Sequence, residues 1–194
     1  MKKAWALILM GIFLILASVS ACAQPILQEG KSSTSYTAAN GKPTIVFRNK
    51  SFYGGQSLPV YSGPGYEYYR ASNGWAKVST DEAIWAAGRE GDWVLILYEI
   101  SSGYRVGYID RSTLQYTLSA DELSFSYTSA KISQSCSMTQ DPISANGKAI
   151  VSLSSGDKVT YLADYYDKED WAYVEVKASG EWVRGFVPLD CISR

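Results

Sequence analysis

Residues 90–114 read EGDWVLILYEISSGYRVGYIDRSTL, and residues 168–192 read KEDWAYVEVKASGEWVRGFVPLDCI. The two stretches match at a constant 78-residue offset (171 − 93 = 78), which pairs Trp93 with Trp171 and Gly107 with Gly185. In each stretch, β-branched and aromatic runs flank a Ser/Gly turn, a pattern typical of a β-hairpin. The sequence therefore predicts two copies of one strand-rich module.

The duplication extends upstream of the hairpins. Gly63-Pro64 and Asp141-Pro142 share the same offset (141 − 63 = 78), and residues 73–79 (NGWAKVS) match residues 146–152 (NGKAIVS) at an offset of 73. Glycine inside a strand pattern indicates a bulge or a close backbone approach, so Gly107 and Gly185 are expected where each sheet bends. Beyond Ala23 no stretch keeps a helical period over three turns. We therefore expect an all-β fold made of two small barrels in tandem.

Composition narrows the function. The 194-residue chain is 46% hydrophobic and 19% charged, which argues against disorder, and its net charge of −1 is too balanced for a nucleic-acid binder. It contains no His, which excludes His-assisted nucleophiles and His-ligated zinc. The carboxylates lie in polar runs typical of solvated loops. With 15 Tyr and 6 Trp, the chain favours a binding protein that has no catalytic residues, metal or cofactor.

The N-terminus is typical of an exported protein. Lys2 and Lys3 precede the apolar run of residues 4–21, so residues 1–23 are predicted to be a signal peptide, with a retained membrane helix as the alternative. Two processing patterns overlap: Ala21-Cys22-Ala23 fits cleavage before Gln24, whereas residues 19–22 (VSAC) resemble a bacterial lipobox. The lipobox pattern implies lipidation of Cys22 and a protein tethered to the outer face of the membrane. Residues 24–42 are polar and predict a flexible tether.

Cys136 and Cys191 are the cysteines left outside the export signal. In the oxidising compartment that export implies, we expect them to form a disulfide, with two buried thiols as the alternative.

The repeated motifs resemble the bacterial SH3 domains of secreted and cell-wall-associated proteins. In the first copy the matching pieces are LPVYSGPG (58–65), GDWVLI and GYI; in the second they are SGDKVTYLA (155–163), DWAYV and GFV. The resemblance covers residues 43–117 and 130–194, joined by a junction at 118–129 in which Leu123, Phe125 and Tyr127 alternate. The second copy departs from the family where CSMTQDP (136–142) replaces VYSGPG.

The resemblance implies SH3-like barrels that recognise peptidoglycan or its peptide cross-links. SH3-type barrels bind extended peptides in aromatic-lined grooves, so the candidate ligand residues are the aromatic side chains of one loop-rich stretch of the first copy: Tyr61, Tyr66, Tyr68, Tyr69 and Trp75. The alternative is that some of them cover their own barrel or pack against the other copy. Trp93 and Trp171 are expected in the core or at a barrel edge. An adaptor that docks an envelope protein is the second functional hypothesis, and we expect contact with a membrane only through a lipid anchor.

Overall fold

The computed structural model describes residues 36–37, 41–144 and 147–194. The predicted signal peptide, Cys22 and most of the predicted tether lie outside the described residues. None of the helices in the described ranges is long and apolar enough to span a membrane. The all-β class is confirmed, because strands, nearly all of them paired antiparallel, make up about half of the described chain and the helical elements are single turns.

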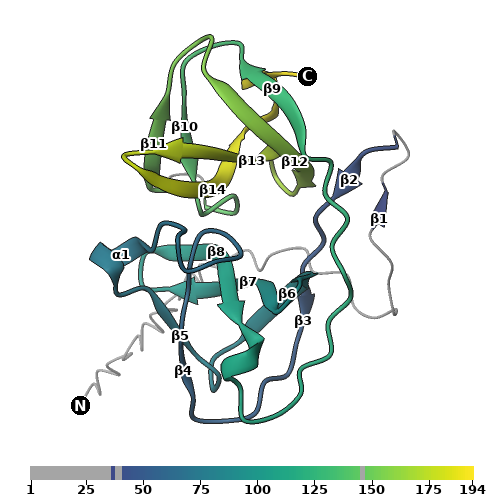
Figure 1. The fold of residues 1–194 in the computed structure, drawn as a ribbon, viewed down its shortest axis with the longest axis vertical. Coiled ribbons are helices and arrows are strands. Elements are labelled where there is room, and N and C mark those ends of the chain that lie inside the picture. The colour runs from purple at the N-terminus through teal and green to yellow at the C-terminus, as the bar shows by residue number, and fades with distance from the viewer. Residues whose placement is uncertain (1–35, 38–40, 145–146) are drawn as a thin grey trace, which may run out of the picture.

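The first copy is built around a four-stranded antiparallel sheet in the order β3-β6-β7-β8, beside a two-stranded β4-β5 ladder (Figure 1). An isolated bridge between Tyr61 and Tyr108 joins the β4 segment to β8. Its elements are β3 (Arg48–Asn49), β4 (Ser57–Pro59), α1 (Ala71–Gly74), β5 (Lys77–Ser79), β6 (Ile84–Glu90), β7 (Trp93–Ile100), β8 (Gly103–Asp110) and η1 (Arg111–Thr113).

The second copy belongs to a sheet in the order β1-β2-β12-β13-β14-β10-β11, with β9 paired to both β12 and β15. Two short N-terminal strands, β1 (Tyr36–Thr37) and β2 (Pro43–Thr44), extend this sheet although they precede the first copy. The other elements are β9 (Thr128–Ile132), β10 (Cys136–Thr139), β11 (Ala149–Leu153), β12 (Lys158–Tyr166), β13 (Asp170–Ala178), β14 (Glu181–Pro188), η2 (Leu189–Cys191) and β15 (Ile192–Ser193).

Neither copy forms a closed barrel among the described residues. In the second copy β11 ends the ladder without a partner beyond β10, and in the first copy the β4-β5 ladder meets β8 through one isolated bridge. The expectation of closed barrels is therefore corrected to two curved, partly open units. The predicted glycines lie where another strand's backbone approaches closely, since a Cβ on Gly107 would come within 2.7 Å of the Tyr61 carbonyl oxygen and one on Gly185 within 2.7 Å of the Thr139 carbonyl oxygen.

The structural repeat follows the 78-residue offset in the hairpins and departs from the expected offset in one strand. Strands β8 and β14 begin and end at the hairpin offset (181 − 103 = 78), and the Tyr61–Tyr108 bridge is matched by Thr139–Phe186. Leu58 and Cys136 are equivalent at the 78-residue offset, and they pair with Val78 and Leu153 respectively. Strands β5 and β11 therefore correspond at an offset of 75 (153 − 78 = 75), whereas the sequence match indicates 73. Because side chains alternate with a period of two, a slip of two positions keeps the same face buried and is invisible to the sequence pattern.

The two copies are related by an approximate two-fold arrangement. The backbone of Thr44 bridges in parallel to Asp164, and that of Glu122, at the same offset (122 − 44 = 78), bridges in parallel to Arg89 of the first copy. The opening segment of each copy thus reaches a sheet strand of the other copy, β12 in one case and β6 in the other. The predicted junction, residues 118–129, is therefore part of the second repeat.

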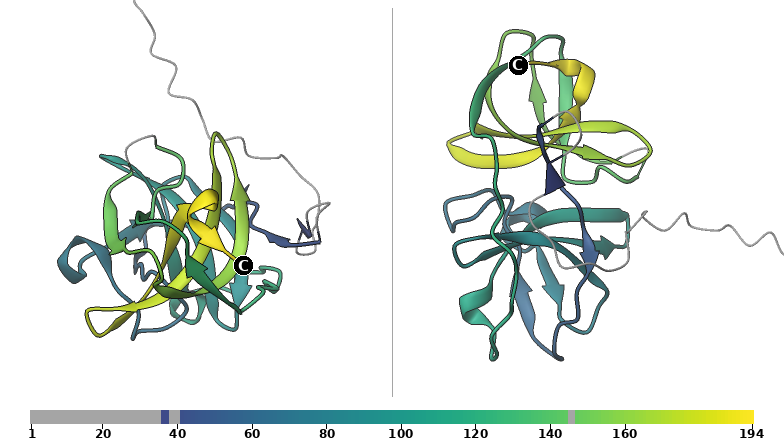
Figure 2. Two further views of the ribbon diagram at one scale, coloured as in Figure 1. Left: turned by 90° about the horizontal axis from the view of Figure 1, so that it is seen from above. Right: turned by 90° about the vertical axis from the view of Figure 1, so that its right-hand side faces the viewer.

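Three hydrophobic clusters hold the molecule together. One lies inside each copy, and the third lies between them, where the copies stack on each other (Figure 2). The shared cluster contains buried side chains from both copies, among them Leu95 and Tyr108 of the first and Tyr173 and Phe186 of the second. Because burying apolar surface is favourable, this shared core stabilises the two copies in the arrangement seen here.

Candidate functional site

Three aromatic rings of the first copy meet at its surface and form what we call the aromatic cluster: Tyr61, Tyr66 and Trp93. Their ring centroids are 5.5 Å apart for Tyr61–Tyr66, 5.6 Å for Tyr61–Trp93 and 4.9 Å for Tyr66–Trp93, all in edge-to-face geometry. Tyr61 is held by its bridge to β8, and Trp93 begins β7. Tyr66 lies on the turn between them with 64% of its surface exposed. Two of the five predicted ligand residues therefore lie together.

Asp110 completes this surface. It pairs with Trp93 across the β7-β8 ladder, and its Oδ2 accepts a 2.5 Å hydrogen bond from the Tyr66 hydroxyl. Its Oδ1 accepts hydrogen bonds from the backbone N–H and the hydroxyl of Ser112, at 2.9 and 2.6 Å. Burial acts to raise the pKa of Asp110, but the bonds from Ser112 and Tyr66 outweigh it and lower the pKa below its usual value. Asp110 is therefore a carboxylate at neutral pH.

Arg70 covers part of the aromatic cluster. Its guanidinium carbon lies 5.5 Å from the Tyr61 ring centroid, and its Nε donates a 2.9 Å hydrogen bond to the carbonyl oxygen of Ala76. The bond to Ala76 fixes the guanidinium over Tyr61, which leaves Tyr66 and Trp93 as the less encumbered rings.

Trp75 is placed apart from the aromatic cluster. It follows a turn in which Ser72, Asn73 and Gly74 all have positive φ angles, and 77% of its surface is exposed. Among the described residues no ring contact joins it to Tyr61, Tyr66 or Trp93.

Tyr68 and Tyr69, the remaining predicted ligand residues, are used in contacts between the copies. The Tyr68 hydroxyl donates a 2.7 Å hydrogen bond to Oε2 of Glu175, and the backbone N–H of Tyr69 donates to the carbonyl oxygen of Trp182 at 2.8 Å. Burial and the bond to Glu175 raise the pKa of Tyr68. For these two residues the structure shows the alternative of packing against the other copy.

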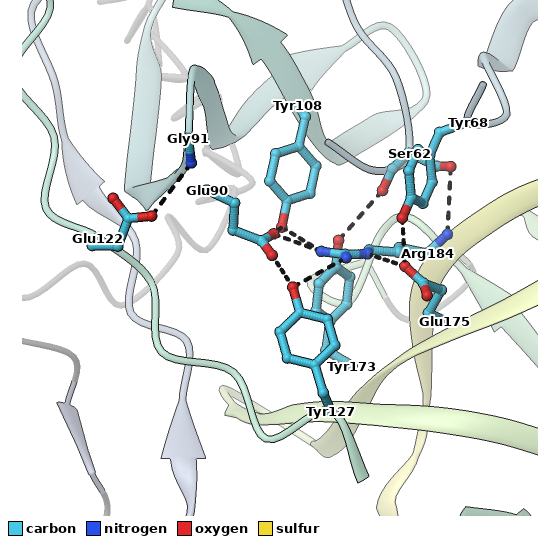
Figure 3. Close-up of polar contacts among 10 residues, drawn as sticks. All are labelled: Ser62, Tyr68, Glu90, Gly91, Tyr108, Glu122, Tyr127, Tyr173, Glu175 and Arg184. Atoms are coloured by element: carbon cyan, nitrogen blue, oxygen red, sulfur yellow. Dashed lines mark hydrogen bonds and ion pairs between the residues drawn. The ribbon is translucent and has the colours of Figure 1, made fainter. Parts of the chain in front are cut away.

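A buried network around Arg184 lies beside Tyr68 (Figure 3). The Arg184 side chain is 3% exposed and donates 2.6 and 2.7 Å bonds to Glu90 of the first copy and Glu175 of the second. Its Nη1 also contacts the Tyr108 hydroxyl at 3.1 Å, and Tyr127 donates to the other oxygen of Glu90. Because its donors are occupied by protein groups, this network joins the copies and does not present an open binding site.

The second copy lacks the aromatic cluster. At the 78-residue offset, Thr139, Ser144 and Pro188 stand where the first copy has Tyr61, Tyr66 and Asp110, and only Trp171 is retained. Trp171 is partly buried, and its indole N–H is buried without a hydrogen-bond partner. The candidate binding surface therefore belongs to the first copy.

A shallow hollow lies beside Asp110. It has a volume of about 400 Å³ and is lined by Asp92, Arg111, Ser112 and residues 114–118. Arg111 and Asp92 form a 3.1 Å ion pair in its wall. Ser112, whose backbone N–H and hydroxyl both donate to Asp110, is one of the lining residues.

The two cysteines lie side by side in the second copy, and the structure records both as thiols. Burial, reinforced by the adjacent Cys191, raises the pKa of the Cys136 thiol to about 12. The expected pair is thus brought together, and the disulfide bond between them stays a prediction. Within the described ranges no group of three or more Cys, Asp or Glu side chains could hold a metal ion.

Sequence reasoning missed Asp110 and the contribution of Trp93 to this surface. A hairpin centred on Ser101-Ser102 places Trp93 opposite Asp110, so the strand register carried the missing signal.

Comparisons with known proteins give little further information. No family model matches the chain, and no curated protein matches it. A solved structure of NlpC2 from Trichomonas vaginalis is similar with 13% sequence identity and a TM-score of 0.31, over 77% of this chain and 48% of that one. The chain therefore spans about half the length of that protein, and a likeness this distant carries no inference about function.

Proposed function

We propose that this protein is an exported, non-enzymatic binding protein of the cell envelope. It recognises cell-wall peptide or glycan through the aromatic cluster of its first copy. The observation that carries the proposal is the exposed Tyr66 ring, which packs edge-to-face on Trp93 and donates a hydrogen bond to Asp110.

A ring held this way favours binding. A tyrosine that is 64% exposed has much of its apolar surface available to a partner, and aromatic side chains are enriched at the centres of binding interfaces. The hydrogen bond to Asp110 and the edge-to-face contacts order the ring before a ligand arrives, which lowers the entropy cost of binding. The resemblance to bacterial SH3 domains supports a cell-wall ligand.

A second candidate function is a surface-tethered adaptor that docks an envelope protein. Trp75 favours it, because a tryptophan 77% exposed on a turn outside the aromatic cluster resembles the anchor of a protein interface.

The location proposed for the protein rests on the export signal and on Cys22, which lies outside the described residues. Lipidation of Cys22 would anchor the protein on the outer face of the membrane. Intact mass of the purified protein tests this proposal: acyl chains on a product that begins at Cys22 support it, and an unmodified product that begins at Gln24 contradicts it.

Cosedimentation with purified wall sacculi tests the function. The chain from Gln24, which keeps every described residue, is expected to pellet with sacculi and to release no muropeptide into the supernatant. Failure to pellet, together with capture by an envelope protein, would favour the adaptor. Muropeptide release would show the protein to be a hydrolase.

A further inference from the structure

We propose that the aromatic cluster and Asp110 together bind a primary ammonium group carried on an extended peptide. This inference rests on the proposed function, since it names the chemical group through which a wall peptide is recognised.

The negative charge of Asp110 is the first feature that favours an ammonium ligand. None of the ion pairs among the described residues includes Asp110, whereas the neighbouring Asp92 is paired with Arg111. A carboxylate offers about four lone-pair sites, and the donors from Ser112 and Tyr66 fill three of them. Asp110 therefore keeps its negative charge and an acceptor position beside the rings.

The aromatic rings beside Asp110 also attract a cation. The face of an aromatic ring carries a partial negative charge and attracts a cation lying within about 6 Å of its centroid. The aromatic cluster already binds one cation of the protein itself in this way, since the Arg70 guanidinium lies 5.5 Å from the Tyr61 centroid. Tyr66 and Trp93 are free of that guanidinium and lie next to the carboxylate. A second cation is thus attracted by the rings and by Asp110 together, whereas an anionic group would be repelled.

The ammonium group must be carried on a longer chain. A cation–π contact at an exposed site contributes only about 0.5–1 kcal/mol, so a free amine binds weakly and useful affinity requires further contacts. The hollow lined by Arg111, Ser112 and residues 114–118 is linked to Asp110 through Ser112, which donates to that carboxylate, and it is where the adjoining peptide would lie. The second copy has Pro188 in place of Asp110 and offers no equivalent charge.

The direct test is a titration of the ¹⁵N-labelled chain from Gln24 with Nα-acetyl-lysine N-methylamide, and with the same compound acetylated on Nε. The cationic probe is expected to shift the Trp93 indole signal saturably, and the neutral probe to bind at least about tenfold more weakly, a difference of roughly 1.4 kcal/mol. Asp110→Asn should lose the same factor. Asp170→Asn, which removes an exposed carboxylate of the second copy, should not.

The outcomes separate this inference from the function on which it rests. Equal binding of the two probes, no binding of the cationic probe, or an unchanged affinity in a folded Asp110→Asn variant overturns the ammonium site. Sacculi whose amines have been acetylated should no longer retain the protein. If acetylated and untreated sacculi retain it equally, wall binding stands and the ammonium inference fails. If neither retains it, the proposed function fails, and the probe titration decides the ammonium site by itself.

Discussion

Arg184 of β14 donates a 2.6 Å bond from its Nη1 to Oε2 of Glu90 in β6, and the two residues belong to different copies. At the 78-residue offset the first copy has Val106 in place of Arg184. The approximate two-fold interface is thus made asymmetric by one buried charge, which also binds Glu175. Removing a single member of a buried ion pair leaves an uncompensated charge, which is far more costly than losing an exposed pair.

The first prediction follows from this relationship. Arg184→Met should lower the free energy of unfolding by about 3–5 kcal/mol, because Glu90 and Glu175 lose their charge partner while largely buried. Urea denaturation followed by tryptophan fluorescence measures the change.

Arg111→Met is the matched control. Its partner Asp92 is well exposed, so the loss should stay below about 1 kcal/mol. Equal losses in the two variants would show that the Arg184 network does not stabilise the interface. Adding Glu90→Gln and Glu175→Gln to Arg184→Met should recover part of the stability.

The second prediction concerns alkaline pH. Burial raises the pKa of Tyr108, Tyr165 and Tyr173 in the folded state, whereas unfolded tyrosines ionise near pH 10. Raised folded-state pKa values mean that this stability is fully present below about pH 10 and is lost as the pH rises further. The urea midpoint should therefore hold between pH 7 and 9 and fall steeply above pH 10. Tyr108→Phe should make that fall shallower, and a flat midpoint up to pH 11 would contradict the prediction.

The third prediction concerns Cys136 and Cys191. With the pKa of Cys136 raised to about 12, its thiol should react slowly with iodoacetamide at pH 8. Glutathione disulfide should oxidise the pair, joining the two sulfurs while it takes up the two hydrogens and is reduced to two glutathione thiols. The closed loop (191 − 136 = 55) should then stabilise the protein by up to roughly 4 kcal/mol. Because the copies share a hydrophobic cluster, we expect one unfolding transition for both. Two titratable thiols after oxidation would rule the bond out, and Cys191→Ser supplies the control.

The fourth prediction concerns Gly107 and Gly185, at which another strand's backbone approaches closely. A Cβ on Gly107 would lie 2.5 Å from a Val60 side-chain carbon and 2.7 Å from the Tyr61 carbonyl oxygen, so Gly107→Ala must displace backbone. We expect a loss of about 1–3 kcal/mol, and the same for Gly185→Ala. In Gly54→Ala the new Cβ would meet only the flexible Asp81 side chain, so this control should change the thermal midpoint little. A midpoint in Gly107→Ala equal to that of the control would contradict the close approach.

Local features of the fold could be predicted from the sequence because they depend on short-range patterns. The hairpins β7-β8 and β13-β14 are indicated by β-branched runs around Ser/Gly turns, and Gly107 and Gly185 stand where a backbone approaches closely. Strand β6 was not evident, since its sequence IWAAGRE has small residues at its centre. The structure explains the glycine: a Cβ on Gly88 would lie 2.8 Å from the carbonyl oxygen of Asp121, whose segment pairs with this strand.

The interface between the copies could not be predicted from the sequence. Periodicity shows that a face is buried but not which segment covers it. The segment that covers β6 contains Glu122, which lies 31 residues beyond Gly91, the residue to which its side chain is hydrogen-bonded (Figure 3). The same limit applies to the candidate site. Tyr61 and Tyr66 were predicted by their aromatic character. Tyr68 was predicted with them but does not belong to the aromatic cluster, because a long-range bridge pairs it with Trp182 of the second copy.

The central claim is that the protein binds the cell wall through the aromatic cluster of its first copy. Its most direct test is the dissociation constant for solubilised wall fragments of the chain from Gln24, compared with Tyr66→Ala and with Trp182→Ala, an exposed aromatic of the second copy. Truncating a binding anchor costs about 1–3 kcal/mol, so Tyr66→Ala should bind roughly tenfold or more weakly while Trp182→Ala binds like the unaltered chain. An unchanged affinity in a folded Tyr66→Ala variant, or a loss confined to Trp182→Ala, would contradict the claim.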